Sequence, residues 1–188
     1  MALIVDNAVQ VGILGCPKLC SPAYPEPGCI LFACKGQGSF QIELDGDLNG
    51  KKPILVQQVS SWKDLTVVQS VESHSRHDLH EKIAARIGIS HFEKIDSQCK
   101  YAMVALGLAG VYIRLASNES YKEKIWDHAA GSLIVQEAGG IVSDALNAPF
   151  NWTLGSSLAQ NTGIIASCNP ELHKQITDSV PLYYPSNK

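Results

Sequence analysis

Four cysteines near the N-terminus have spacings at which metal ligands occur. Cys16 and Cys20 have three residues between them, Cys29 and Cys34 have four, and eight residues separate the two pairs. Thiolates in two such pairs can bind zinc. Prolines crowd this stretch, however, and apolar residues separate the second pair, where free cysteine is commonly a small buried hydrophobic residue. We therefore expect buried, reduced cysteines, and a zinc-stabilised interaction module is the alternative.

Histidine recurs at every third position in one polar stretch, at His74, His77 and His80. Imidazole nitrogens are frequent metal ligands, so this run is a second candidate cluster. The surfaces of helices and loops often carry such runs, and this favours side chains that hold no metal.

A third stretch places an acidic residue at the start of the clearest helical pattern in the chain. Residues 123–131 are Glu-Lys-Ile-Trp-Asp-His-Ala-Ala-Gly, and Glu-Ala-Gly-Gly follows at 137–140. The helix dipole and the free amides of a first turn favour negative charge. Capping preferences alone therefore predict that Asp127 is a helix N-cap.

The whole string resembles the C-terminal signature of the inositol monophosphatase superfamily and, more narrowly, that of the 3'(2'),5'-bisphosphate nucleotidases, as found in fungi. Further matches occur in the family's order, at residues 14–17, 35–38, 96–101, 106–109 and 163–167. The resemblance covers the chain from residue 3 to about residue 167. It implies an inositol monophosphatase-like α/β fold with layered helices and sheets. It also implies a Mg²⁺-dependent phosphatase that removes the 3'-phosphate of adenosine 3',5'-bisphosphate, and of its sulfated form, to give AMP.

The resemblance implies roles for five residues. Asp127 would be a ligand of the catalytic Mg²⁺, which suits a carboxylate because this cation prefers oxygen donors. Groups that hold the nucleotide in the family match His74, Ser97, Lys100 and Arg114. Lysine and arginine can pair with phosphate, serine can donate a hydroxyl hydrogen bond, and histidine can stack on or bond to the nucleoside. The alternatives for these four are a loop histidine, a helix cap, a solvated helix lysine and a surface ion pair.

The family builds most of its metal site from residues that precede the Trp-Asp string. They include a Gly-Glu-Glu-like element and an Asp-Pro-Ile-Asp-Gly-Thr loop, and neither is present in these 188 residues. With Asp127 as the one ligand, Mg²⁺ should bind weakly, so we expect little or no phosphatase activity from this chain alone. The chain resembles the C-terminal half of such an enzyme, which makes a complementing N-terminal half an expected partner. The alternatives are an inositol-phosphate monophosphatase and a non-catalytic remnant that binds a nucleotide or a protein.

The elements that would position these residues begin with antiparallel strands. Apolar runs at 2–5 and 9–14 flank Asp6-Asn7, and runs at 29–34 and 39–44 flank the glycine-containing residues 35–38. Both patterns predict hairpins. We interpret residues 1–64 as the remainder of an N-terminal sheet domain.

From residue 65 to 180 strands alternate with helices, which is typical of an α/β domain. Helices are predicted at 77–87, 97–109 and 127–138, and a last one begins with Asn169 as N-cap and Pro170 at its first position. The expected fold is therefore antiparallel hairpins followed by an αβα unit, with a frayed tail at 181–188. Strands are predicted at 66–70, 92–95, 111–115, 141–143 and 163–167.

Composition excludes several classes of protein. Hydrophobic residues make up 45% of the chain and charged residues 18%, which predicts a sizeable core. A formal charge of −3 argues against a broad nucleic-acid or membrane-binding face. No apolar run approaches the roughly 20 residues of a membrane span, and the first residues lack the basic stretch of a signal peptide. We expect a cytoplasmic protein that acts on a small molecule, and the resemblance adds sulfur assimilation and lithium sensitivity.

Overall fold

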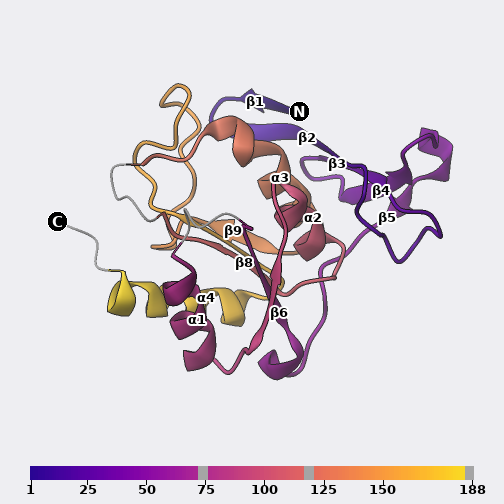
Figure 1. Ribbon diagram of the computed structural model, residues 1–188. Coiled ribbons are helices and arrows are strands. Elements are labelled where there is room, and N and C mark those ends of the chain that lie inside the picture. Colours follow the sequence, from indigo (N-terminus) through magenta and orange to yellow (C-terminus); the bar gives the residue numbers. More distant parts are fainter. Residues whose placement is uncertain (72–75, 117–120, 185–188) are drawn as a thin grey trace.

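The computed structural model of the chain describes residues 1–71, 76–116 and 121–184. In the described part, two helices lie between two β-sheets, and two further helices cover the other face of the second sheet (Figure 1). These layers confirm the predicted mixed α/β fold, in which antiparallel hairpins precede an αβα unit.

The first sheet is an antiparallel meander in which each strand pairs with the next in the chain. Both predicted hairpins are confirmed. Asp6 and Asn7 connect the first pair with φ angles of 49° and 59°, the left-handed conformation that a two-residue hairpin turn requires. The strands are β1 (Ala2–Val5), β2 (Ala8–Cys16), β3 (Cys29–Cys34), β4 (Ser39–Glu43) and β5 (Lys52–Pro53).

The second sheet has the order β7-β6-β8-β10-β9 and is mixed. Strand β6 runs parallel to β7 and β8, whereas β10 runs antiparallel to β8 and β9. The predicted alternation of strands and helices is confirmed, because helices connect the parallel strands. The strands are β6 (Thr66–Gln69), β7 (His91–Lys94), β8 (Val111–Arg114), β9 (Ile141–Ser143) and β10 (Ile164–Ser167).

Helices α2 (Cys99–Ala105) and α3 (Ala129–Glu137) pack between the sheets, while α1 (His77–Arg86) and α4 (Pro170–Tyr183) pack together on the other side (Figure 1). The predicted start of α4 is confirmed, since the Asn169 side chain accepts hydrogen bonds from the amides of Glu171 and Leu172. Three short 3₁₀ turns complete the described elements: η1 (Leu48–Gly50), η2 (Trp62–Asp64) and η3 (Ile125–Asp127).

Two predicted helices differ from the structure at their ends. The helix predicted at 97–109 is limited to α2, because Ser97 and Gly107 on either side have φ angles of 59° and 71°. The prediction that Asp127 is an N-cap is wrong. Asp127 ends the turn η3, and His128 is the residue that precedes the first residue of α3.

The frayed tail predicted after Val180 is also wrong for the described residues. Helix α4 continues through Pro181 to Tyr183. Val180 is fully buried, and the hydroxyl of the buried Tyr184 donates a hydrogen bond to the Ala116 carbonyl oxygen at 3.3 Å. Burial on both sides of the proline therefore holds the last turn against the core.

The first sheet ends at Pro53 and the second begins at Thr66, on either side of the boundary expected between residues 64 and 65. One buried apolar cluster nevertheless includes Leu31 of β3, Ile134 of α3 and Ile165 of β10. The division of the chain into domains stays a prediction. None of the described helices is long and apolar enough to cross a membrane.

Strand β2 and helix α3 approach closely at Gly12. A Cβ atom at this position would lie 2.7 Å from the carbonyl oxygen of Ala130, a backbone atom that cannot rotate away. Gly15 lies on the same strand, and a Cβ there would meet nothing within 4 Å. The contact at Gly12 therefore sets the spacing between the first sheet and the helical layer.

We expect Gly12→Ala to destabilise the protein by about 1–3 kcal/mol, because the added methyl group overpacks a rigid contact. Urea unfolding measures the change in the free energy of unfolding. Gly15→Ala is the matched control and should change it by less than about 0.5 kcal/mol. Equal losses in the two variants would contradict this account of the interface.

Candidate functional site

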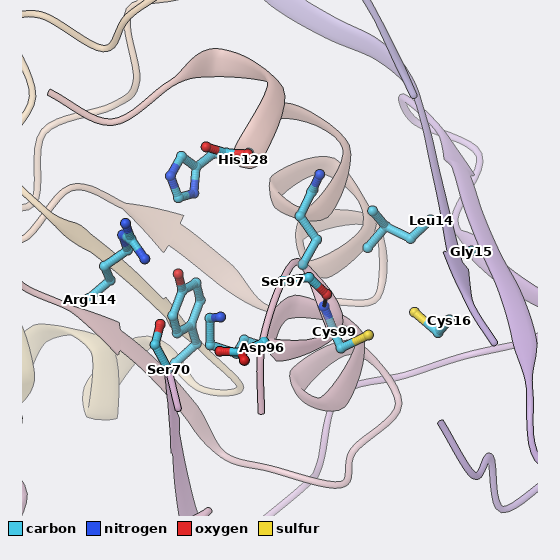
Figure 2. A pocket seen from close by; sticks show the side chains of 13 residues that line it. Leu14, Gly15, Cys16, Ser70, Asp96, Ser97, Cys99, Arg114 and His128 are labelled. Atoms are coloured by element: carbon cyan, nitrogen blue, oxygen red, sulfur yellow. Dashed lines mark hydrogen bonds between the residues drawn. The ribbon is translucent and has the colours of Figure 1, made fainter. Parts of the chain in front are cut away.

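A pocket of about 510 Å³ opens where the ends of β2 and β6, the start of α2, strand β8 and turn η3 meet. Four of the five residues that the sequence predicts for a site line it: Ser97, Lys100, Arg114 and Asp127. Figure 2 shows side chains that face the pocket from both the helical layer and the strands. The chain thus brings together groups that are up to 30 residues apart.

Lys100 is a buried cation without a carboxylate partner. Its side chain is only 3% exposed, and its Nζ donates to the Ile95 carbonyl oxygen at 3.3 Å and lies 5.5 Å from the centre of the Tyr112 ring. Burial, with the positive charge of Arg114, lowers the pKa of Lys100 to about 8. Within the described residues no carboxylate lies within ion-pair distance of Nζ. The alternative of a solvated helix lysine is therefore wrong.

Arg114, at the end of β8, is held by a buried acid. Its Nε donates to Glu123 Oε1 at 2.6 Å, and the arginine side chain keeps 28% of its surface exposed at the pocket. Burial opposes the charge of Arg114, but the neighbouring Tyr112 and Glu123 raise its pKa. The alternative for Arg114 was a surface ion pair, and the observed pair is instead partly buried. This pair fixes the direction of the guanidinium.

Glu123 connects Arg114 to two further buried groups. Its Oε2 atom lies 3.0 Å from His128 Nε2, and His128 Nδ1 lies 2.9 Å from the Tyr101 hydroxyl. An ionised carboxylate only accepts, so Nε2 donates to it, and in the neutral imidazole Nδ1 accepts from the tyrosine. Burial alone would raise the pKa of Glu123, but the contacts with His128 and Arg114 outweigh it and lower that pKa.

The loop before α2 is joined to the turn that carries Asp127. The side-chain amide of Gln98 donates to the Trp126 carbonyl oxygen and its oxygen accepts from the Gly131 amide, both at 3.0 Å. Ser97 is exposed at the pocket and has a left-handed backbone, while Gln98 is the residue that caps α2. Gln98 makes no side-chain capping bond, whereas Ser97 Oγ accepts a hydrogen bond at 3.4 Å from the amide of Cys99, the first residue of α2. Ser97 therefore supports the start of the helix and is also exposed at the pocket.

Asp127 presents a carboxylate to the pocket. The residue is exposed, and its side chain forms no hydrogen bond or ion pair with another described residue. An accessible carboxylate is a suitable ligand for Mg²⁺. Across the described residues, however, no group of three or more His, Cys, Asp or Glu side chains could hold a metal ion. Asp127 is thus suited to be one ligand of a metal ion. The described residues do not provide the further ligands of a complete Mg²⁺ site.

Within the described residues, His80 of the histidine run is not available as a metal ligand. His80 is fully buried, with Nδ1 3.0 Å from Gln69 Oε1 and Nε2 accepting from the Leu115 amide at 3.2 Å. Both ring nitrogens are therefore engaged, and burial lowers the pKa of His80 to about 3, so the ring is neutral. His74, which the sequence predicts as a nucleotide-binding residue, lies outside the described residues.

The zinc alternative for the four N-terminal cysteines is wrong. Cys16 pairs with Cys29 in the register of β2 and β3, but Cys34 ends β3 opposite Val11. Five residues of strand span about 17 Å, whereas thiolates that share one zinc each lie about 2.3 Å from it. All six cysteines are free thiols in the structure, as expected, but the expected burial is wrong for the exposed Cys20 and holds only in part for Cys34.

Sequence reasoning missed Gln98, Tyr101, Glu123 and His128 as parts of the site. Three of these connect the predicted residues and do not themselves face the solvent. A signal was present at Glu123, a carboxylate two residues before the apolar pair Ile125 and Trp126. The distance between Glu123 and Arg114 in the chain hides their pairing, because it depends on how β8 and η3 approach each other.

Known proteins resemble this chain in sequence and in fold. The model of the Inositol monophosphatase family matches residues 1–182. A 3'(2'),5'-bisphosphate nucleotidase of Dictyostelium discoideum is 43% identical over 183 residues, which cover 96% of this chain and 54% of that protein. A 3'(2'),5'-bisphosphate nucleotidase of Schizosaccharomyces pombe is 38% identical and covers 89% of this chain and 49% of its own length. The chain spans about half the length of these relatives.

Solved structures show the same fold. An inositol monophosphatase from Anabaena superposes with a TM-score of 0.68 at 17% identity, over 98% of this chain and 66% of that one. An inositol monophosphatase from Zymomonas mobilis gives a TM-score of 0.66 at 18% identity, over 95% and 60%. At such identities the likeness concerns the fold alone, and it confirms the fold expected from the sequence.

We expect Glu123→Gln to destabilise the protein by about 2–4 kcal/mol at pH 7, because it leaves Arg114 without its charged partner in a mostly buried site. The pH dependence tests the cause. A carboxyl with a lowered pKa stabilises the fold above its unfolded-state pKa, and this contribution disappears as the pH falls through the folded-state value. The difference between wild type and variant in urea unfolding should therefore shrink below about pH 4.

Asp178→Asn is the control for this variant, since it removes a carboxylate from the exposed pair with Lys174. It should change the free energy of unfolding little at any pH, because water screens exposed pairs. A Glu123→Gln loss that stays the same from pH 7 to pH 3 would show that the carboxylate charge is not what stabilises this network.

Proposed function

We propose, on the premise that this chain belongs to the inositol monophosphatase family, that it is the nucleotide-binding part of a 3'(2'),5'-bisphosphate nucleotidase. The complete enzyme would hydrolyse the 3'-phosphate ester of adenosine 3',5'-bisphosphate, or of its sulfated form, to AMP and inorganic phosphate. This assignment takes the substrate class from the curated relatives, which are about twice as long as this chain.

The observation that carries the proposal is the buried, unpaired charge of Lys100 beside Arg114. Burying a cation without an anion is costly, and a phosphate group in the pocket would remove that cost. Arg114 adds a planar guanidinium that suits two phosphate oxygens. Both cations face one pocket, so they could bind the same phosphate group.

The remaining site residues complete the proposed arrangement. The hydroxyl of Ser97, exposed at the same pocket, would donate a hydrogen bond to the nucleotide. His74 would contact the nucleoside. Asp127 would supply one ligand to a Mg²⁺ ion, which in a complete enzyme activates water and neutralises phosphate charge.

The other ligands of that ion would come from a complementing N-terminal half, and the edge of the first sheet supports this. Strand β1 pairs with β2 on one side, and its Leu3 and Val5 side chains are 53% and 44% exposed. An edge strand with exposed apolar side chains is suited to pair with a further strand. Mg²⁺ as the metal, inhibition by Li⁺, a place in sulfur assimilation and a cytoplasmic location belong to this proposal.

A second candidate function is a non-catalytic nucleotide-binding protein. The observation in its favour is that the described residues hold no group of three or more side chains that could bind a metal ion, although Asp96 and Asp127 both line the pocket. The two candidates share the binding site and differ in turnover, so separate measurements of binding and turnover distinguish them.

We expect no release of phosphate from adenosine 3',5'-bisphosphate above background when the purified chain is incubated with Mg²⁺. One carboxylate leaves most of the coordination shell of the ion to water. A colorimetric phosphate assay measures this, with the full-length Dictyostelium relative as the positive control. Release that depends on Mg²⁺ and disappears in Asp127→Asn would show that this chain holds a complete catalytic site.

We expect the chain to bind AMP and Lys100→Met to weaken that binding at least about tenfold, because a charge-assisted contact with phosphate is lost. Isothermal titration calorimetry measures the affinity. Below its pKa of about 8 Lys100 carries the charge that attracts the anion, so wild-type affinity should fall from pH 8 to 9.5. The profile of Lys100→Met should be flatter over this range.

Lys82→Met is the matched control, since Lys82 is an exposed lysine on α1. It should leave AMP binding unchanged. Removal of the buried Lys100 charge should not lower the stability of the fold, so weaker binding cannot be ascribed to unfolding. Equal affinity of wild type and Lys100→Met would refute the phosphate site.

A further inference from the structure

Two cysteines from different layers meet at the edge of the pocket. Cys16 ends β2, and Cys99 is the first residue of α2. Both line the pocket, and Figure 2 shows the two sulfur atoms directed toward each other across the gap between strand and helix. Cys16 is 1% exposed and Cys99 is half-buried, so a small molecule in the pocket reaches Cys99 first.

The surroundings favour the thiolate at Cys99 and the thiol at Cys16. A hydrogen bond from the Cys16 thiol, acting against burial and together with Ser97 and Lys100, lowers the pKa of Cys99 to about 6. The same contact, together with burial, raises the pKa of Cys16. The ionisable groups that face Cys99 are Cys16 on β2, Cys29 on β3 and Lys100 on α2.

We propose that Cys99 and Cys16 form an oxidation site, in which a hydroperoxide such as hydrogen peroxide oxidises Cys99 and Cys16 then closes a disulfide. In the first step the Cys99 thiolate attacks one peroxide oxygen, the O–O bond breaks, and the products are a sulfenic acid and hydroxide. In the second step the Cys16 sulfur attacks the Cys99 sulfur. The hydroxyl group leaves with the Cys16 proton as water, so two thiols and one peroxide give one disulfide and two waters.

The first step prepares the second. Cys16 keeps its proton mainly because of the thiolate beside it, and the sulfenic acid no longer carries that charge. Oxidation of Cys99 therefore removes the main obstacle to ionisation of Cys16. An accessible thiolate next to a buried partner thiol is the arrangement of redox-sensitive cysteine pairs.

Cys29 is the competing partner, because it lies opposite Cys16 in the register of β2 and β3. It is fully buried, and burial raises its pKa to about 11. Neither Cys16 nor Cys29 offers an accessible thiolate for the first attack. The order of reaction therefore begins at Cys99, and the disulfide connects β2 to α2 rather than β2 to β3.

A bond between Cys16 and Cys99 would change the phosphate site. Ser97 and Lys100 lie two residues before and one residue after Cys99. Drawing the start of α2 toward β2 would shift both side chains, so the oxidised chain should bind AMP more weakly. This last consequence rests on the proposed function, whereas the disulfide itself does not.

The test exposes the purified chain to hydrogen peroxide at pH 7 and maps disulfides by mass spectrometry of unreduced peptides. The expected main product joins Cys16 to Cys99. In Cys16→Ser the oxidised Cys99 should instead be trapped by dimedone as a sulfenic acid. Cys34→Ser is the matched control and should form the same Cys16–Cys99 bond as wild type. A main product that joins Cys16 to Cys29, or no disulfide at Cys99, would overturn the proposal.

Alkylation gives an independent measurement that needs no oxidant. The rate of iodoacetamide labelling at Cys99 should rise with a midpoint near pH 6 in wild type and shift to higher pH in Cys16→Ser, because the stabilising hydrogen bond is lost. A midpoint near the ordinary thiol value of about 8.5 in wild type would overturn the proposal. Circular dichroism confirms that each serine variant is folded.

AMP titration of the oxidised chain separates this inference from the proposed function. Weaker binding after oxidation, recovered with dithiothreitol, supports both. If the reduced chain does not bind AMP, the proposed function is refuted. The peptide map then decides by itself whether the disulfide forms. Equal AMP binding by the reduced and fully disulfide-bonded chains would overturn the part of the proposal that couples oxidation to the pocket.

Discussion

The geometry of the pocket depends on how closely helix α3 can approach its neighbours. At Gly12 the absence of a side chain lets β2 lie against the backbone of Ala130, and at Gly131 it makes room for the ring of Tyr101. These two contacts place turn η3, and with it Asp127, opposite the start of α2. The spacing between the walls of the pocket is therefore set by missing side chains, and the polar contacts across it form only because that spacing is short.

Within this frame the two cations of the pocket are supported in different ways. Glu123 compensates the charge of Arg114, and His128 bonds to the other oxygen of that acid while its second ring nitrogen bonds to the Tyr101 hydroxyl. Lys100 has a backbone carbonyl and an aromatic ring as its neighbours. Arginine thus contributes direction. Lysine contributes a charge that has no ion-pair partner among the described residues, although Asp96, Cys99 and Glu123 favour it from further away, so the proposed attraction for an anion would depend mainly on Lys100. Burial of the Lys100 charge lowers the stability of the fold, and an anion bound in the pocket would restore that stability.

The sequence predicts the elements better than it predicts the contacts between them. Hairpins and alternating strands follow from local patterns, and the α4 cap follows from Asn169 and Pro170, so each of these is confirmed. The ends of the helix predicted at 97–109 and the N-cap position of Asp127 were wrong, because they depend on left-handed backbone at Ser97 and Gly107 and on the turn η3. The Arg114–Glu123 pair could not be predicted, since its partners meet only after β8 and η3 are packed. The pattern of residues within a segment is local. Whether an acid or a lysine in that segment is buried depends on how the whole chain packs.

Anion binding and metal binding have different requirements in this structure. The groups suited to a phosphate lie on α2, on the loop before it and at the end of β8, and their supports come from the same region. A hard cation instead needs several oxygen donors around one point. The described residues bring two exposed carboxylates to the pocket, Asp96 and Asp127, and form no group of three or more metal-binding side chains. Because the groups proposed to bind phosphate are supported without metal ligands, binding would persist in the absence of turnover. The Cys16–Cys99 contact lies at the boundary between β2 and α2, so a change there would act on binding without involving a metal ion at all.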